Sequence, residues 1–181
     1  MYSIVDIETT GQSAGKGKIT EVAIYVHNGI EVVRSFSSLV NPECYIPYYI
    51  TKLTGIDNQM TVNAPKFYEI AKTIIELTAS CTFVAHNVTF DYRFVREEFK
   101  KLGYDYKRKT LCTVKLSRTY LPGYQSYSLG NICRDLNIRI DGRHRAAGDA
   151  LATVKLFEII MERHKHPDVP RTGTGIQRTL F

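Results

Sequence analysis

Long hydrophobic runs are missing from this sequence of 181 residues. The longest uninterrupted apolar stretch runs only from Val22 to Val26, whereas a membrane-spanning helix needs about 20 apolar residues. The opening segment, MYSIVDIETT, has no basic part followed by an apolar part, as a secretory signal would. We therefore expect no membrane span, no secretory signal and a cytoplasmic location.

Cysteine is also scarce, and its pattern argues against a disulfide-stabilised domain and against a zinc module. None of the four cysteines forms a CxxC pair or has the Cys–His spacing of a zinc module; they are Cys44, Cys81, Cys112 and Cys133. A chain of this length buries roughly 70% of its unfolded surface and needs no disulfide scaffold. We expect reduced thiols in one ordinary globular domain.

Acidic residues are fewer than basic ones. Lys and Arg number 24 against 18 Asp and Glu, which gives a net charge of +6 and a pI near 9.1. This balance favours a polyanionic partner such as nucleic acid. Because many basic proteins bind no polyanion, charge alone leaves the partner open.

The order of periodic segments predicts an α/β fold. Apolar, β-branched runs at 2–7, 19–27 and 30–40 predict three strands, and Asn28-Gly29 predicts a hairpin between the last two. A short buried strand is expected at 82–86. Helical periodicity predicts helices at 64–79, 88–102, 110–120, 128–136 and 145–164, while 41–60 is interpreted as a loop with at most a short helix at 48–53. Strands first and helices later indicate a mixed sheet surrounded by helices.

The periodic pattern ends near His164. The segment HPDVPRTGTG, His166–Gly175, contains proline and glycine and no apolar period, which is typical of a flexible linker. We therefore divide the chain into a domain at 1–165 and a flexible tail at 166–181.

Two acids lie on the first predicted strand. Asp6 and Glu8 are two positions apart, so their carboxylates point to the same face of the strand. Adjacent carboxylates repel each other, and a cation would compensate them. A solvated strand end is the alternative interpretation of this pair alone.

Two further acids lie on apolar helix faces. Asp91 shares a face with Phe94 and Val95, and Asp149 shares one with Leu156 and Ile160. A buried acid needs a partner, and neither stripe contains Lys or Arg. A metal ion is therefore the candidate partner, and carboxylate oxygens select Mg²⁺ or Mn²⁺ over zinc. For Asp91, favourable interaction with the helix dipole is the alternative.

A histidine precedes the last helix. His144 stands five residues before Asp149, on a lead-in rich in Ala and Gly. Such a histidine can approach a metal-bound water without ligating the metal, which is the place of a general base. An ordinary exposed or core histidine is the alternative, and only the neighbouring acids favour the catalytic role.

Three segments resemble, in order and spacing, the motifs of the DEDDh family of 3′→5′ exonucleases: VDIETTG at Val5–Gly11, AHNVTFD at Ala85–Asp91 and HRAAGD at His144–Asp149. The resemblance covers roughly residues 2–162. Within the family, the sequence is similar to the proofreading (epsilon) branch associated with bacterial DNA polymerase III. It implies a ribonuclease H-like fold with the first three strands antiparallel. No motif position is substituted, so we expect an active enzyme.

The resemblance also implies the site and its chemistry. Four acids would hold two divalent cations, Mg²⁺ or Mn²⁺, and His144 would be the general base; the acids are Asp6, Glu8, Asp91 and Asp149. The expected substrate is the 3′ end of single-stranded or frayed DNA, shortened one nucleotide at a time during proofreading or repair.

Substrate contacts are expected at the edges of the motifs. Thr9, Thr10 and Gly11 follow the first acids, and glycine permits close approach of the terminal nucleotide. Candidates for stacking on or wedging the last bases are Leu53, Ile56 and Phe90. Core packing is the alternative for these three.

Other functions stay open at this point. One alternative is an RNA-trimming exoribonuclease of the same family, since rejection of the 2′-hydroxyl depends on fine local shape. Another is a catalytically idle nucleic-acid-binding module. The segment from Asp6 to Thr10 also resembles the loop of aspartyl-phosphate phosphatases, but Glu8 stands where those enzymes need a second Asp.

The tail carries a short pattern of its own. Gln177, Leu180 and Phe181 form a QxxLF pattern that resembles the motif by which bacterial replication proteins bind the sliding clamp. We expect a polymerase subunit and the clamp as partners. An apolar end without function is the alternative.

Overall fold

A single mixed sheet forms the centre of the computed structural model, which describes residues 1–166. Its strand order is β3-β2-β1-β4-β5. The strands are β1 (Tyr2–Thr9), β2 (Ile19–His27), β3 (Val32–Leu39), β4 (Thr82–Ala85) and β5 (Thr110–Cys112). β2 pairs antiparallel with β1 and β3, whereas β4 pairs parallel with β1 and β5. The predicted mixed sheet with three antiparallel strands is confirmed.

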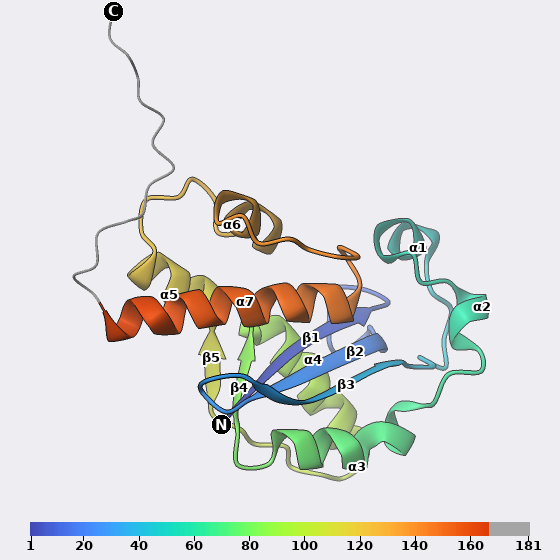
Figure 1. Cartoon of the computed structure of the whole chain (residues 1–181). Coiled ribbons are helices and arrows are strands. Elements are labelled where there is room, and N and C mark those ends of the chain that lie inside the picture. The colour runs from blue at the N-terminus through green and yellow to red at the C-terminus, as the bar shows by residue number, and fades with distance from the viewer. Residues whose placement is uncertain (167–181) are drawn as a thin grey trace, which may run out of the picture.

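Helices cover both faces of this sheet (Figure 1). They are α1 (Tyr48–Thr54), α2 (Asn58–Thr61), α3 (Phe67–Thr78), α4 (Val88–Lys101), α5 (Thr113–Tyr120), α6 (Leu129–Asp135) and α7 (Ala146–Lys165). Within residues 1–166, no helix combines the length and the apolar composition that crossing a bilayer requires.

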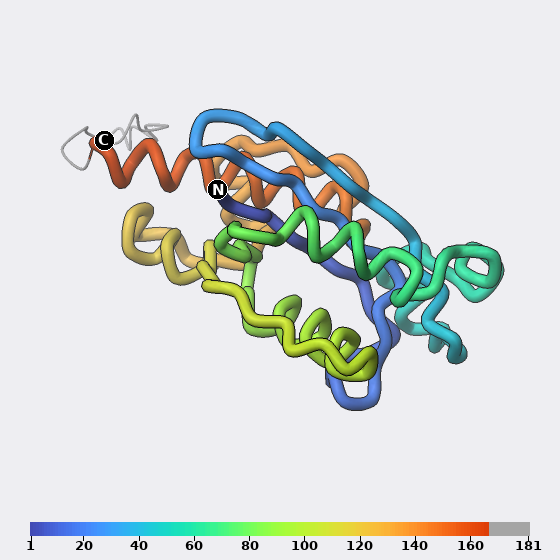
Figure 2. Tube along the Cα trace, turned by 90° about the horizontal axis from the view of Figure 1, so that it is seen from below, coloured from blue at the N-terminus to red at the C-terminus, as the bar shows by residue number. Residues whose placement is uncertain are grey.

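Side chains of β1 alternate between the two faces of the sheet and so join two separate packing layers. Val5 and Ile7 join the core that α3 and α4 build, with Phe94 among its members. Ile4 points the other way and packs against Val154 and Phe157 of α7. Figures 1 and 2 show the same arrangement, with α7 across one face of the sheet and α3 on the other. Asp6 and Glu8 follow Ile4 at steps of two residues along the strand, so their side chains point to the same face of the sheet as Ile4, towards α7.

The predicted hairpin forms at Asn28-Gly29. Gly29 adopts a φ of 103°, which few other residues tolerate. The side chain of Asn28 accepts hydrogen bonds from the backbone N–H groups of Ile30 and Glu31, at 2.8 and 2.9 Å. The turn therefore joins β2 to β3 without a long loop.

Two short elements differ from the sequence prediction. The helix predicted at 110–120 begins with three residues of strand, β5, and only α5 is helical. The segment predicted as loop at 41–60 contains α2 in addition to the short helix α1. The other predicted elements end within three residues of the observed bounds.

Candidate active site

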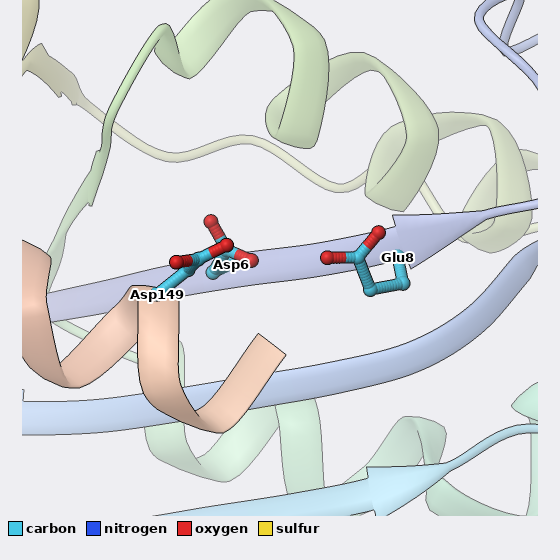
Figure 3. A group of neighbouring side chains, drawn as sticks. All are labelled: Asp6, Glu8 and Asp149. Atoms are coloured by element: carbon cyan, nitrogen blue, oxygen red, sulfur yellow. The ribbon is translucent and has the colours of Figure 1, made fainter. Parts of the chain in front are cut away.

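The two acids of β1 lie beside the start of α7 (Figure 3). Asp6 and Glu8 are on the strand, and Asp149 is in the first turn of the helix. Each of the three offers a carboxylate oxygen, and these oxygens all lie within 4.8 Å of one another. Figure 3 shows Asp6 and Asp149 close together and Glu8 further along β1. A strand and a helix distant in sequence thus bring three carboxyl groups to one place.

Asp149 has one oxygen in use and one without a partner. Its Oδ2 accepts a hydrogen bond of 3.0 Å from the backbone N–H of His144. Its Oδ1 is buried and has no hydrogen-bond partner within the part of the chain that the structure describes. A buried carboxylate oxygen without a donor is costly, so this oxygen is suited to a cation.

Asp91 approaches the same acids from the other layer. It lies in the first turn of α4, is 4% exposed, and its Oδ1 accepts a hydrogen bond of 3.2 Å from the backbone N–H of Ile7. Asp91 is not among the three acids with converging oxygens, but its charge raises the pKa of Asp6. The prediction that Asp91 faces the apolar side of its helix is confirmed.

Burial makes all four acids reluctant to ionise. It raises the pKa of Glu8 to about 7 and that of Asp91 to about 8. The pKa of Asp6 is raised by burial and then by the charges of Asp91, Asp149 and Glu8. Burial also raises the pKa of Asp149, against the hydrogen bond from His144. A cation among these groups would stabilise their charged forms.

The donor set fits a hard divalent cation. Carboxylate oxygens are the ligands that Mg²⁺ and Mn²⁺ prefer. The converging oxygens of Asp6, Glu8 and Asp149, together with the unpartnered Oδ1 of Asp149, meet that preference.

An ion pair between a partly exposed arginine and a buried acid holds the start of α7 against β2. Glu21, 3% exposed, accepts hydrogen bonds from Arg145 Nε and Nη2 and from the backbone N–H of Ala146. The shortest Arg145–Glu21 distance is 2.7 Å. Glu21 lies directly opposite Glu8 in the sheet. This pair therefore fixes the segment that carries His144 and Asp149 against the strand next to the acids.

The segment before α7 is tightly packed and strained. His144 has a φ of 61°, an uncommon value for a residue other than glycine. A Cβ on Gly148 would lie 1.9 Å from the carbonyl oxygen of Asp141, so only glycine fits there. Strain of this kind often accompanies a functional site, and here it places His144 beside Asp149.

The predicted substrate contacts have different surroundings. Thr9 and Thr10 are buried; Thr9 donates a hydrogen bond to the carbonyl of Gly11 and Thr10 accepts one from Lys18. Gly11 is partly exposed, and the hydroxyl of Tyr49 lies 3.9 Å from where a Cβ on Gly11 would be.

The three apolar candidates also differ. Leu53 is 53% exposed, and Ile56 is fully buried with Ile46 and Ile50. The prediction that Ile56 contacts a base is therefore wrong for this structure, because it has no accessible surface. Phe90 is partly buried against Phe94 and lines a cavity of about 220 Å³ at the start of α4.

Two residues near the site, Glu21 and Tyr49, escaped the sequence analysis. The ion pair between Glu21 and Arg145 forms only because the fold brings β2 and the start of α7 together. Tyr49, 64% exposed on α1, had no spacing that connected it to Gly11. An acid within an otherwise apolar strand was the one available signal for Glu21. The predicted clamp-binding residues Gln177, Leu180 and Phe181 lie outside the described residues.

Comparison with known proteins assigns the family. The model of the exonuclease family matches residues 3–157. The epsilon subunit of DNA polymerase III from Aquifex aeolicus is 35% identical over 163 residues, which cover 89% of this chain and 80% of that protein. The chain belongs to the exonuclease family. The resemblance inferred from the three motifs is confirmed.

Other exonucleases are similar over the same region. The 3′-5′ exonuclease DinG of Bacillus subtilis is 38% identical over 171 residues, but the chain spans only 18% of its length. A solved structure of Exonuclease X in complex with 5′ overhanging duplex DNA is 27% identical, has a TM-score of 0.74, and is covered to 92%. Exonuclease I of E. coli in complex with a dT13 oligonucleotide, 17% identical with a TM-score of 0.79, shares the fold over 91% of this chain.

Proposed function

We propose that this exonuclease domain removes nucleotides one at a time from the 3′ ends of DNA by metal-dependent hydrolysis. The observation that carries the proposal is the convergence of Asp6, Glu8 and Asp149, with a buried oxygen of Asp149 left without a donor. The similarity to a DNA polymerase III epsilon subunit and to Exonuclease X supports DNA as the substrate.

The metal ligands in this proposal are Asp6, Glu8, Asp91 and Asp149, and the cofactors are two divalent cations, Mg²⁺ or Mn²⁺. When bound, such ions neutralise charge on the phosphate and lower the pKa of water. The raised pKa values of Glu8 and Asp91 mean that both groups release a proton when a cation binds near neutral pH.

His144 is the proposed general base. Its backbone N–H donates a hydrogen bond to Oδ2 of Asp149, so His144 is anchored beside one of the acids. In this proposal its imidazole accepts the proton of the attacking water. A protonated imidazole cannot accept this proton, so the reaction requires neutral His144.

The terminal nucleotide is proposed to lie between β1 and α1. Gly11 leaves room above the β1 end, and Tyr49 and Leu53 offer exposed apolar surface beside it. Phe90 lines the cavity at the start of α4 and provides a second apolar wall. Aromatic side chains stack on any base, so this arrangement suits removal of nucleotides without regard to sequence.

The proposed setting is DNA proofreading or repair in the cytoplasm. All four cysteines are free thiols, which agrees with a reducing compartment. A polymerase subunit is a proposed partner because of the epsilon relative. The sliding clamp is a second one, on the sequence of Gln177, Leu180 and Phe181 alone.

One assay tests the proposal against its rivals. The chain is incubated with Mn²⁺ and matched DNA or RNA single strands labelled at the 5′ end, with EDTA and an Asp6→Asn, Asp149→Asn variant as controls. We expect a ladder of DNA shortened stepwise from its 3′ end, only with metal and only with the wild-type chain. Faster loss of RNA would favour the exoribonuclease, and binding without digestion would favour the idle module.

A further inference from the structure

A basic groove runs along the outer face of α4. It has a volume of about 560 Å³, and the loop that follows the helix forms its other wall. The residues that determine its character are Arg93, Arg96, Glu97, Lys100, Tyr104 and Tyr106. None of them belongs to the acidic site, so the groove needs an explanation of its own.

The cations of the groove form one row. Arg93, Arg96 and Lys100 follow each other at spacings of three and four residues, so they share one face of the helix, and all three are exposed. In residues 1–166, Arg93 and Lys100 have no ion pair, and Arg96 only packs over the ring of Tyr92 at 5.8 Å. The row spans about 10 Å, the axial length of about three stacked nucleotides.

The acids in the groove do not cancel this charge. Asp105 is paired with Lys107 at 2.5 Å, which leaves Glu97 as the one unpaired acid of the lining described. The groove therefore keeps a positive excess that suits an anion with several charges.

The floor of the groove is aromatic. Tyr106 is 1% exposed and stacks on Phe99, with ring centroids 4.7 Å apart and planes 2° apart. Tyr104 packs against Phe99 as well and is 40% exposed. An exposed ring beside unpaired cations is the combination that binds single-stranded nucleic acid, because bases stack while phosphates meet the charges.

The groove continues towards the candidate active site. Arg93 lines both the groove and the cavity of about 220 Å³ that Phe90 and Asn87 also line. Phe90 precedes Asp91 directly, so this cavity lies at the end of α4 that carries the fourth acid. Arg93 thus connects that end of α4 to the row of cations further along the same helix.

We infer that the α4 groove binds the single strand upstream of the 3′ terminal nucleotide, with Arg93, Arg96 and Lys100 on successive phosphates and Tyr104 against a base. The inference rests on the proposed exonuclease function and adds to it the path of the substrate strand. It explains why a chain with a net charge of +6 leaves three cations unpaired in one row of its domain.

The test uses the double variant Arg96→Gln, Lys100→Gln, which removes two charges at the end of the groove far from the acids. Digestion of a 20-nucleotide strand should show a KM raised about tenfold and an unchanged kcat. Hydrolysis of thymidine 5′-(p-nitrophenyl phosphate), which has no upstream strand, should be unaffected. In EDTA, fluorescence anisotropy of the same strand measures Kd at several salt concentrations. The slope of log Kd against log salt concentration should be smaller for the variant than for the wild type by about 1.4, because two phosphate contacts are lost.

The matched control is Lys72→Gln, Lys155→Gln, which removes two exposed charges on α3 and α7. If this control weakens strand binding as much as the groove variant does, net charge explains the effect and the inference is overturned. If the wild type binds the strand through the groove but digests no DNA with metal, the proposed function fails instead. Equal KM values for groove variant and wild type on the 20-nucleotide strand would also overturn the inference.

Discussion

Asp149 is buried and one of its oxygens has no hydrogen-bond donor within residues 1–166, so its charged form destabilises the metal-free protein. Asp149→Asn keeps the acceptor for the N–H of His144 and removes the repulsion from neighbouring acids. We expect nuclease activity to be lost. The free energy of unfolding in EDTA at pH 8 should be unchanged or higher by ~1 kcal/mol. Chemical denaturation in EDTA measures this, and marked destabilisation would mean that Asp149 is needed for the fold itself.

His144 has a single proposed role that a side-chain deletion can test. His144→Ala should lower kcat by ~10²–10⁴-fold, because no group would accept the proton of water. Metal binding should persist, since the acids are intact, and the acid limb of the wild-type pH–rate profile should change shape. His166→Ala, an exposed histidine after α7, is the control. A rate unaffected by His144→Ala would remove this residue from the mechanism.

At the residue scale, the acids could be predicted from the sequence because spacing alone puts each on a definite face. Asp6 and Glu8 share a strand face, and Asp91 and Asp149 lie on apolar helix faces. Ile56 could not be judged in this way, because its burial with Ile46 and Ile50 depends on how the loop around α1 folds back.

The tie between β2 and α7 is a feature of elements rather than of single residues. Arg145→Ala would leave the carboxylate of Glu21 buried with only the N–H of Ala146 as donor. We expect a loss of ~2–4 kcal/mol in the free energy of unfolding and a fall in kcat, since the segment with His144 loses its anchor. Thermal melts and DNA digestion measure the two effects.

Two further variants separate this tie from ordinary surface charge. Lys155→Ala breaks an exposed pair with Glu158 on the same helix and should cost less than ~0.5 kcal/mol. Arg145→Lys keeps the charge but not the two-pronged contact, so it should recover only part of the activity. Full activity in Arg145→Ala would show that Glu21 and Arg145 do not position the site.

Short elements were the ones that sequence periodicity missed. β5 has three residues, too few for an alternating pattern, and it forms because Phe83 and Val84 of β4 offer parallel partners to Thr110 and Leu111. α2 has four residues and depends on Asp57, whose side chain accepts a hydrogen bond from the N–H of Met60 at 2.8 Å. Both arise from tertiary or capping contacts rather than from hydrophobic pattern.

For the whole molecule, the raised pKa values give stability a definite dependence on pH. Between about pH 4 and pH 7–8 the folded chain holds protons on Glu8 and Asp91 that the unfolded chain releases. Stability of the metal-free protein should therefore fall as pH rises through this window. Thermal unfolding in EDTA between pH 5 and pH 8.5 measures it, and the Glu8→Gln variant should show a weaker dependence.

Bound metal should offset the fall in stability that accompanies a rise in pH. Mn²⁺ at about 100 times its Kd adds ~2.7 kcal/mol to stability, or about 5–10 °C in Tm for a domain of this size. Because cations and protons compete for Glu8 and Asp91, the rise in Tm should be larger at pH 8.5 than at pH 6. A Tm that does not respond to Mn²⁺ at either pH would contradict the metal site.

The strand order of the whole sheet could not be predicted from periodicity. The hairpin signal placed β2 beside β3, but nothing in the pattern states that β4 lies parallel to β1. The family resemblance implied a mixed sheet with three antiparallel strands and did not place β4 either. The parallel pairing of β4 with β1 brings the start of α4, and with it Asp91, next to the N–H of Ile7.

The acids come from β1, α4 and α7, and this order along the chain has a consequence for biosynthesis. A ribosome adds roughly 5–20 residues per second, so roughly 7–30 s separate the synthesis of Asp6 from that of Asp149. Until α7 is synthesised, the nascent chain lacks Asp149 and therefore the third of the converging carboxylates. The acidic site can thus be completed only after the residues of all five strands have been made.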